Sequence, residues 1–418
     1  MKKTKFLAAL AAAGVLALLA GCSHAPGGGS DNGSGATITF AHWGNNQENA
    51  TIKAIVAAFE KAHPDIKVES TWVQNNYEQQ LQTTIAGGTA PTVSQISNTS
   101  LASFVSAYQP VELNPSAYYS PNIAESAKVD GKYYETPFTV KTKVMAINKT
   151  LFEKSGVAVP DASTPMTPDE FAAAGAKLTS GSGKDKVYGS APLWYQGWLT
   201  AEGGSEYSAN GKTCEFDSAA STRAADQVIA AQGPNGYAPT LLDAQGQDMF
   251  DWLSIGRIAM YPDFGPWNIA QLAGLKNASD FAVVPVPGKG EPMEIDGLGI
   301  SKTANAAQTK AAKTFVDFVS TDKRAQDLLT TKTSSLGVPV IAAAEKPFRA
   351  AAPDLDLKTF ISAVDQSKMT PSVKQTTVIE TKLTTDLGSR TAVGSGHESP
   401  STVLPELNKA CQAALDGK

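Results

Sequence analysis

The segment that begins at residue 37 repeats a strand–helix–strand–helix–strand order, which few folds accommodate. Hydrophobic and polar residues alternate over 37–43 and again over 66–72, and a third short strand is predicted over 92–96. Between these strands, hydrophobic residues recur at helical spacing over 52–59 and 77–85. Strands that are joined by helices run parallel and carry helices on both faces of their sheet. The segment therefore predicts an α/β fold with a mostly parallel sheet.

A second run of the same kind occupies the middle of the chain. Strands are predicted over 144–148, 257–261 and 281–287, and helices over 218–232, 307–319 and 322–331. Thr167-Pro168-Asp169-Glu170 has the spacing of a capping box with proline at the first helical position, so a further helix is predicted to begin there. The last 60 or so residues are predicted to be mostly helical. With 418 residues, the chain is long enough for two such α/β units.

The first 22 residues have the pattern of an export signal rather than of a folded element. Three lysines precede an apolar run over 6–20, which is shorter than a membrane span. The run ends in a Leu-Ala-Gly-Cys tetrad that resembles a bacterial lipobox, in which the cysteine, here Cys22, is lipidated. Residues 23–36 are rich in glycine and serine and predict a flexible tether. We therefore expect a globular protein that a lipid at Cys22 anchors to the extracellular face of the cell membrane.

Composition and motifs disfavour several classes of protein. The formal net charge is −5, which argues against the cationic surface that a nucleic-acid-binding protein requires. The sequence contains no GxSxG, Walker A, GxGxxG, HExxH or CxxC motif, and its four histidines are scattered. We therefore expect no cofactor, no metal centre and no nucleic-acid partner. A pair of catalytic carboxyl groups of the glycosidase type stays open among the 40 aspartates and glutamates.

Two cysteines, Cys214 and Cys411, belong to the predicted mature domain. Outside the cell they can oxidise to a disulfide. They lie 197 positions apart in the sequence, which says nothing about their distance in space. The sequence therefore leaves open both a disulfide and two buried thiols.

Tryptophans lie near the predicted ends of several strands. Trp43 ends the first strand, Trp194 and Trp198 share one aromatic cluster, and Trp267 lies in a loop that contains Gly and Pro. In open α/β sheets, ligands bind beyond the carboxyl ends of the strands. The C–H-rich face of a sugar ring stacks on an aromatic ring, and its hydroxyl groups hydrogen-bond to Asn, Gln and Asp side chains. The positions favour a carbohydrate site, and core packing is the alternative explanation for each tryptophan.

Five segments resemble the family-1, carbohydrate-type extracellular solute-binding proteins, which are the capture subunits of ATP-binding-cassette (ABC) importers. These segments are 55–69, 77–93, 133–157, 256–270 and 298–321. The most specific are YYETPFTVKTKVMAINKTLFEKSGV (133–157) and GRIAMYPDFGPWNIA (256–270). The similarity covers about residues 36–340. Lys141 and Thr142 depart from the family, which frequently has small or polar residues at this crossover.

The resemblance implies a two-lobed α/β fold of the periplasmic-binding-protein type (type II) around a cleft. Each lobe would contain a mixed, mostly parallel sheet flanked by helices, and three hinge crossovers would join the lobes. We place the crossovers near 139–142, 281 and 320–321. Lobe 1 is predicted to comprise 36–139 and 282–320, and lobe 2 to comprise 140–281 and 321–418. Cys214 and Cys411 would then both belong to lobe 2.

The resemblance also implies a mechanism and a set of contact residues. A solute would enter the cleft, the lobes would close on it, and the membrane subunits of the importer would recognise the closed form. The predicted contacts from lobe 1 are Trp43, Asn45, Asn46, Ser97, Asn98 and Gly297. The predicted contacts from lobe 2 are Trp194, Tyr195, Trp198, Asp263 and Trp267. Trp267 is expected to stack on a sugar, and Asp263 is expected to accept hydrogen bonds from its hydroxyl groups.

Simpler roles stay open for some of these residues, and other functions stay open for the chain. Asn45 and Asn46 suit the start of a helix, and Asp263 suits the turn after Pro262. The leading prediction is a monomer that binds a sugar or oligosaccharide and delivers it to an ABC permease. The alternative solutes are a polyol, a glycerophosphodiester or a peptide. Outside solute binding, the alternatives are a surface glycosidase and a structural adhesin.

Overall fold

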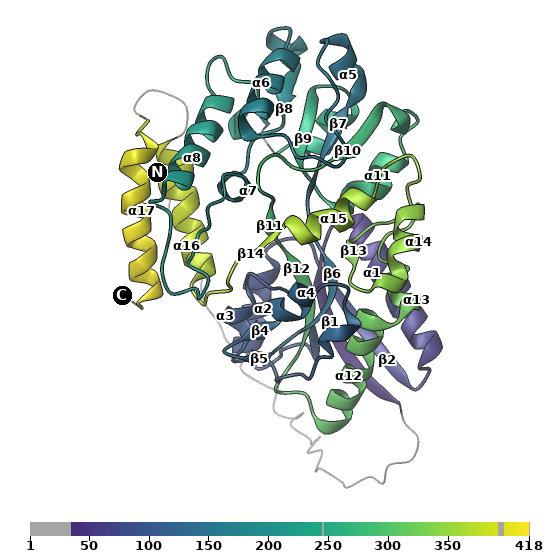
Figure 1. Ribbon diagram of the computed structural model, residues 1–418. Coiled ribbons are helices and arrows are strands. Elements are labelled where there is room, and N and C mark those ends of the chain that lie inside the picture. Colours follow the sequence, from purple (N-terminus) through teal and green to yellow (C-terminus); the bar gives the residue numbers. More distant parts are fainter. Residues whose placement is uncertain (1–34, 245, 392–396, 418) are drawn as a thin grey trace, which may run out of the picture. The chain divides into compact units, whose positions relative to one another are not determined.

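The computed structural model describes residues 35–244, 246–391 and 397–417 (Figure 1). The predicted signal segment 1–22, the lipidation site Cys22 and all but the end of the predicted tether 23–36 lie outside the described residues. Within the described part of the chain, no helix is both long enough and apolar enough to cross a membrane.

The described strands form two larger sheets and two small ones (Figure 1). The six-stranded sheet has the order β13-β6-β12-β3-β1-β2, with β1 Ala36–Trp43, β2 Ile66–Val73, β3 Val93–Ser97, β6 Thr136–Val140, β12 Ile295–Ile300 and β13 Val338–Pro339. The four-stranded sheet has the order β10-β7-β9-β8, with β7 Val144–Asn148, β8 Tyr188–Ser190, β9 Ile258–Phe264 and β10 Phe281–Val284. The two-stranded sheets pair β4 Lys128–Val129 with β5 Lys132–Tyr133 and β11 Pro292–Met293 with β14 Lys368–Met369. We call the part of the chain around the six-stranded sheet lobe 1 and the part around the four-stranded sheet lobe 2.

Helices connect the strands of both lobes. In the first half of the chain they are α1 Asn46–Ala62, α2 Tyr77–Ala86, α3 Leu101–Phe104, α4 Pro121–Ser126, α5 Lys149–Lys154, α6 Pro168–Leu178 and α7 Tyr195–Ala201. In the second half they are α8 Ala219–Ala231, α9 Leu241–Ala244, α10 Met249–Ser254, α11 Ile269–Ala273, α12 Ala306–Thr321, α13 Lys323–Gln326, α14 Glu345–Ala350, α15 Lys358–Gln366, α16 Thr376–Lys382 and α17 Pro400–Leu415.

The sheet of lobe 1 confirms the α/β pattern predicted for its first three strands. β1 pairs in parallel with both β2 and β3. β12 then runs antiparallel to β3 and β6, so the sheet is mixed. Helices α1 and α12 bury aromatic side chains against it, and the ring of Phe315 lies 5.3 Å from that of Phe40 and 5.0 Å from that of Phe59, centroid to centroid. This buried cluster fixes β1 and hence the position of the loop that follows it.

Helix starts follow the local sequence signals, whereas one predicted helix ends early. Thr167 forms the predicted capping box with Glu170 at the start of α6. The helix predicted over 322–331 is only α13 Lys323–Gln326. The buried side-chain amide of Gln326 donates to the carbonyl groups of Phe138 and Val319. Its oxygen accepts from the backbone N–H of Val340, so the chain leaves the helix to join the sheet of lobe 1.

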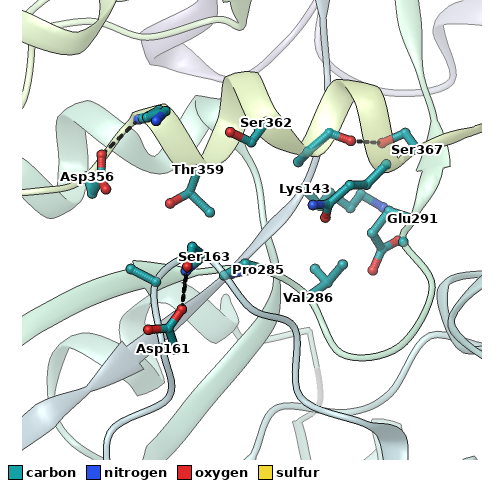
Figure 2. A pocket seen from close by; sticks show the side chains of 15 residues that line it. Lys143, Asp161, Ser163, Pro285, Val286, Glu291, Asp356, Thr359, Ser362 and Ser367 are labelled. Atoms are coloured by element: carbon teal, nitrogen blue, oxygen red, sulfur yellow. Dashed lines mark hydrogen bonds between the residues drawn. The ribbon is translucent and has the colours of Figure 1, made fainter.

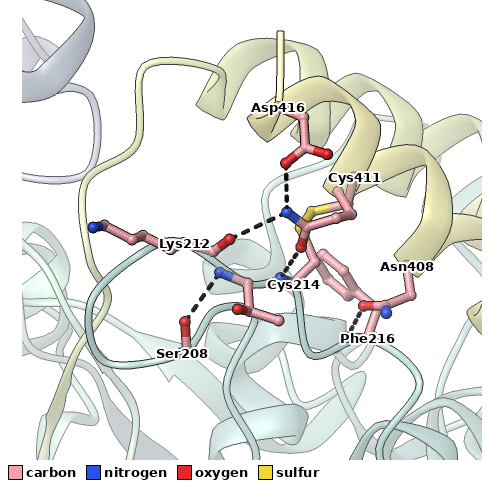
Figure 3. The surroundings of a disulfide bond; sticks show 9 residues. Ser208, Lys212, Cys214, Phe216, Asn408, Cys411 and Asp416 are labelled. Atoms are coloured by element: carbon pink, nitrogen blue, oxygen red, sulfur yellow. Dashed lines mark hydrogen bonds between the residues drawn. A yellow bond between two sulfur atoms is a disulfide. The ribbon is translucent and has the colours of Figure 1, made fainter. Parts of the chain in front are cut away.

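A disulfide joins Cys214 to Cys411 in lobe 2, with their Cα atoms 6.2 Å apart (Figure 3). It ties the segment before α8 to the C-terminal helix α17. Two side chains of α17 hold the same segment, since Gln412 accepts from the backbone N–H of Cys214 at 3.1 Å and Asn408 from that of Phe216 at 2.9 Å. The C-terminal helix is therefore fastened to lobe 2 by covalent and hydrogen bonds together.

Strand pairing departs from the predicted lobe boundaries at two places. β10 (Phe281–Val284) pairs with β7, so residues 282–284 belong to the sheet of lobe 2 and not of lobe 1. β13 (Val338–Pro339) pairs with β6, so the chain returns to lobe 1 after residue 321. Both pairings join segments that lie far apart in the sequence, and local sequence patterns do not predict such pairings. The remaining boundaries stay predictions.

Candidate functional site

The chain passes from the sheet of lobe 1 to that of lobe 2 through Lys141, Thr142 and Lys143, between β6 and β7. The lysine side chains are only 5% and 12% exposed. A buried ammonium group needs carboxylate or carbonyl partners to offset its lost hydration. The partners of these two lysines therefore show which parts of the chain meet at the crossover.

Lys143 brings together two of the predicted contact residues of lobe 2. Its Nζ lies 2.8 Å from Oδ1 of Asp263 and 3.7 Å from the centroid of the Trp194 ring. Burial alone would lower the pKa of Lys143, but the carboxylates of Asp263 and Glu291 outweigh it and raise the pKa. The ammonium group is thus charged at neutral pH and holds the Trp194 ring by a cation–π contact.

Lys141 makes the corresponding contacts toward lobe 1. Its Nζ lies 2.5 Å from Oε1 of Glu48 in α1 and 3.7 Å from Oδ2 of Asp296 in β12. It also lies 5.5 Å from the centroid of the Trp267 ring. The Trp267 ring is folded over Gly265, where a Cβ atom would come within 2.2 Å of it. Glycine at 265 is therefore required for the observed position of Trp267.

A pocket of about 100 Å³, which we call the Trp194 pocket, lies beside this crossover. Trp194 is 40% exposed and forms part of its wall. Thr99 reaches it from lobe 1, directly after β3. Its other polar side chains include Gln196, Thr200, Glu206 and Glu380 of lobe 2. The pocket combines one accessible aromatic ring with hydrogen-bonding groups from both lobes.

Hydrogen bonds between the lobes hold the Thr99 edge of the pocket. The hydroxyl of Ser372 donates to the carbonyl oxygen of Thr99 at 3.0 Å and accepts from the N–H of Ala102 at 2.9 Å. The hydroxyl of Thr376 donates to the same carbonyl oxygen at 3.2 Å. The segment before α16 is therefore joined to the turn that follows β3.

The pocket contains two carboxyl groups with raised pKa values, Glu206 and Glu380. Burial, together with the nearby carboxylate of Glu380, raises the pKa of Glu206 to about 7. Burial also raises the pKa of Glu380. At neutral pH the Glu206 carboxyl group is divided between its protonated and ionised forms, so it can donate a hydrogen bond as well as accept one.

The structure gives most of the predicted lobe 1 contacts structural roles. Asn45 caps α1, its side-chain oxygen accepting from the N–H groups of Gln47 and Glu48, and the exposed Asn46 is the first residue of that helix. Asn98 is buried and accepts from the N–H of Ile295 at 2.8 Å. These bonds engage the side-chain oxygens of Asn45 and Asn98 within the protein.

Three further lobe 1 positions were predicted. Buried Ser97 bonds to the hydroxyl of Thr99 at 3.0 Å. Trp43 is half-buried, with its ring centroid 5.0 Å from that of Tyr77. A Cβ at Gly297 would lie 2.5–2.7 Å from side-chain atoms of Glu135, so the close neighbour of this glycine is a buried carboxyl group and not open cleft.

In lobe 2, the aromatic cluster divides between pocket and core. Tyr195 is buried and its hydroxyl lies 2.5 Å from that of Ser221. Trp198 is 4% exposed and packs on Phe171 with 5.0 Å between ring centroids. Both point into the core of lobe 2, because they lie three residues apart on one face of α7. Trp194, at the N-cap of that helix, remains accessible.

Several residues of the site were not predicted. Lys143 was not singled out, although it shares the crossover with Lys141. Thr99 and Gln196 lie next to predicted positions, whereas Glu206 and Glu380 lie in segments with no recognisable motif. The signal that could have identified Thr99 and Gln196 is a polar side chain beside a predicted contact residue.

Known proteins resemble the chain over most of its length. The sequence model described as "Bacterial extracellular solute-binding protein" matches residues 43–326. An uncharacterised lipoprotein of Streptomyces antibioticus is 29% identical over 337 residues, which cover 74% of this chain and 71% of the relative. The diacetylchitobiose-binding protein DasA of Streptomyces coelicolor is 23% identical over 347 residues, covering 77% and 79%.

Among solved structures, the ABC substrate-binding protein Lmo0181 of Listeria monocytogenes, in complex with cycloalternan, superposes with a TM-score of 0.80. The alignment covers 91% of this chain and 99% of that one at 22% identity, which shows the two-lobed fold. The family model spans more than half of the chain, including the four-stranded sheet, most strands of the six-stranded sheet and the crossover between them. The chain therefore belongs to the bacterial extracellular solute-binding protein family.

Proposed function

We propose that this protein captures a sugar or oligosaccharide between its two lobes, with one sugar ring at the Trp194 pocket, and delivers it to an ABC importer. The observation that carries the proposal is the exposed indole ring of Trp194, fixed by Lys143 at 3.7 Å and surrounded by hydrogen-bonding side chains. An aromatic face suits the C–H face of a sugar ring, and such a contact adds about 0.5–1.5 kcal/mol beyond the area that it buries.

The polar lining of the pocket suits the hydroxyl groups of a sugar. Gln196 and Thr200 offer both donors and acceptors. Glu206, with a pKa raised to about 7 by burial, offers a donor or an acceptor according to its protonation. A phosphate-bearing solute would instead favour a lining rich in arginine, and Lys368 is the one cationic residue among the lining residues that the structure describes.

Closure of the lobes would complete the site. Thr99 belongs to lobe 1 and the other polar side chains of the pocket to lobe 2, so a solute that touches both stabilises the arrangement in which they meet. The names of relatives point the same way, since DasA is a diacetylchitobiose-binding protein and the Listeria protein was solved with cycloalternan. The closed form would then dock on the membrane subunits of the importer as a monomer.

The attachment to the membrane is part of the proposal. Cys22 and the segment 23–34 lie outside the described residues, and the relative from Streptomyces antibioticus is called a lipoprotein. A lipid on Cys22 and a Gly/Ser-rich tether would keep the two lobes at the outer face of the membrane, close to the permease. Mass spectrometry of the membrane-extracted protein would detect a lipidated N-terminal cysteine.

Replacing Trp194 with alanine should weaken sugar binding at least about tenfold, because the stacking platform is lost. Isothermal titration calorimetry with diacetylchitobiose and cycloalternan measures this without relying on tryptophan emission. Ile255→Ala is the matched control, since it removes an exposed apolar side chain outside the pocket. Unchanged affinity in a folded Trp194→Ala protein would rule out the assigned site, and an equal loss in the Ile255 control would show that the effect is not local.

A further inference from the structure

A second cavity, of about 260 Å³, lies under helix α15 (Figure 2). Its walls include Lys143, Ser163, Val286, Glu291, Thr359 and Ser362. The volume equals that of roughly eight water molecules, enough for a small organic molecule. Its lining comes from the crossover, from the loop after α5, from the segment that follows β10, and from α15.

This cavity is separate from the Trp194 pocket, and the two share no lining residue. The small β11–β14 sheet stands between them. Glu291 and Ser367 line the cavity, whereas the next residues along the chain, Pro292 and Lys368, line the Trp194 pocket. The N–H of Lys368 donates to the carbonyl oxygen of Glu291 at 3.0 Å and joins the two segments.

Two deeply buried side chains of the cavity each contain a polar atom that has no hydrogen-bond partner among the described residues. Glu291 is 8% exposed, and its Oε2 has no hydrogen-bond partner among the described residues. Thr359 is 5% exposed, and its Oγ1 is likewise without a partner in that part of the chain. A buried polar atom without a hydrogen bond destabilises the fold by about 1–3 kcal/mol. A ligand that supplies hydrogen-bond donors to both would remove that cost.

Among the other charged residues of the cavity, Lys143, Asp161 and Asp356 are already engaged, and Lys358 is exposed at the start of α15. Lys143 pairs with Asp263 and lies over Trp194. Asp161 accepts from the N–H of Ser163 at 2.8 Å and from its hydroxyl at 2.6 Å. Asp356 accepts from the backbone N–H of Lys358 at 3.2 Å. Glu291 is therefore the deeply buried ionisable group that a ligand would meet.

We propose that this cavity is a second binding site, for a small organic ammonium ion. The ammonium group would donate to Oε2 of Glu291, a further polar group of the ligand would bond to Oγ1 of Thr359, and its carbon chain would lie against Pro285, Val286 and Ala363. A cation suits the site because its charge would add to that of Lys143 and stabilise the ionised form of the buried Glu291 carboxyl group.

The proposal predicts a specific pH dependence. Burial raises the pKa of Glu291 to about 8, with Lys143 lowering it and Asp263 raising it. Below this pKa the carboxyl group is protonated in the free protein, so binding of an ammonium ion releases a proton. The affinity should therefore rise about tenfold per pH unit between pH 6 and pH 7.5 and level off above the pKa.

The test uses three probes of equal length and falling charge with the full-length protein: 1,4-diaminobutane, 4-amino-1-butanol and 1,4-butanediol. Calorimetry and thermal unfolding should show that both amines bind and the diol does not, with tighter binding at pH 7.5 than at pH 6. Equal binding of all three probes, binding by none, or an amine affinity independent of pH would each overturn the proposal. No sugar is present, so the result is independent of the proposed sugar site.

Substitutions locate the binding. Glu291→Gln should weaken amine binding at least tenfold and abolish its pH dependence, whereas Glu153→Gln, which removes the same charge from an exposed helix position, should change neither. If Glu291→Gln does not fold, the Thr359→Val variant tests whether the amine binds in this cavity. That variant removes the unpartnered Oγ1 atom of Thr359 and should weaken the binding of 4-amino-1-butanol at least threefold. Amine binding that survives unchanged in the folded variants would contradict the assignment.

Discussion

Replacing Lys141 with methionine is expected to lower the free energy of unfolding by about 3–5 kcal/mol, because it leaves two buried carboxylates without their cation. Asp296 is fully buried and Glu48 is 8% exposed, and the Lys141 ammonium lies between them. Lys141 also donates to the carbonyl oxygen of Leu336 at 2.8 Å, which would lose its partner. Chemical denaturation at pH 7 measures the change.

The loss of unfolding free energy caused by Lys141→Met should become smaller as the pH falls. Burial raises the pKa of Asp296, Lys141 opposes the rise, and the pKa should climb further once the lysine is gone. A carboxyl group whose folded pKa exceeds its unfolded value of about 3.9 stabilises the fold increasingly as the pH falls toward that value. The difference between variant and wild type should therefore be larger at pH 7 than at pH 5. Lys67→Met, which removes an exposed partner of Glu60, should have little effect at either pH.

Removing the disulfide should lower the stability by about 2–5 kcal/mol, because the cross-link restricts the unfolded chain between residues 197 positions apart. Cys214→Ser, Cys411→Ser and the double variant should unfold at nearly the same, lower temperature, since each removes the same bond. A reductant should lower the unfolding temperature of the wild type to that of the variants, whose own unfolding temperatures should not change. A wild type that is insensitive to reductant would show that the bond does not contribute.

The sequence predicted the elements whose signals are local. The alternating pattern of 37–43 and the spacing of Thr167 and Glu170 correctly placed β1 and the start of α6, because strand periodicity and capping depend on neighbouring residues. The pairing of β13 with β6 was missed, because it joins segments about 200 positions apart and depends on where α13 ends. The early end of α13 depends in turn on distant partners of Gln326, which no local window contains.

The candidate site was predicted only in outline. Trp194 lines a pocket, and its contact with a solute stays a prediction. Tyr195 and Trp198 turn into the core because residues 195–201 form a helix. Their spacing of three could have indicated that helix. Lys143 was not predicted, because its role depends on Asp263, 120 positions away, and on Trp194 of another segment. The role of a buried charged residue can be assigned only when its partners in space are known.

The central claim is that the pocket binds a carbohydrate, and titration of the purified protein tests it most directly. Intrinsic tryptophan fluorescence would be followed with glucose, maltose, diacetylchitobiose and cycloalternan, and calorimetry would confirm each response. We predict saturable binding of at least one oligosaccharide at micromolar concentration, about −8 kcal/mol, with the sugar recovered unchanged. If none of these sugars binds and a peptide or a glycerophosphodiester gives a saturable response, the claim is contradicted.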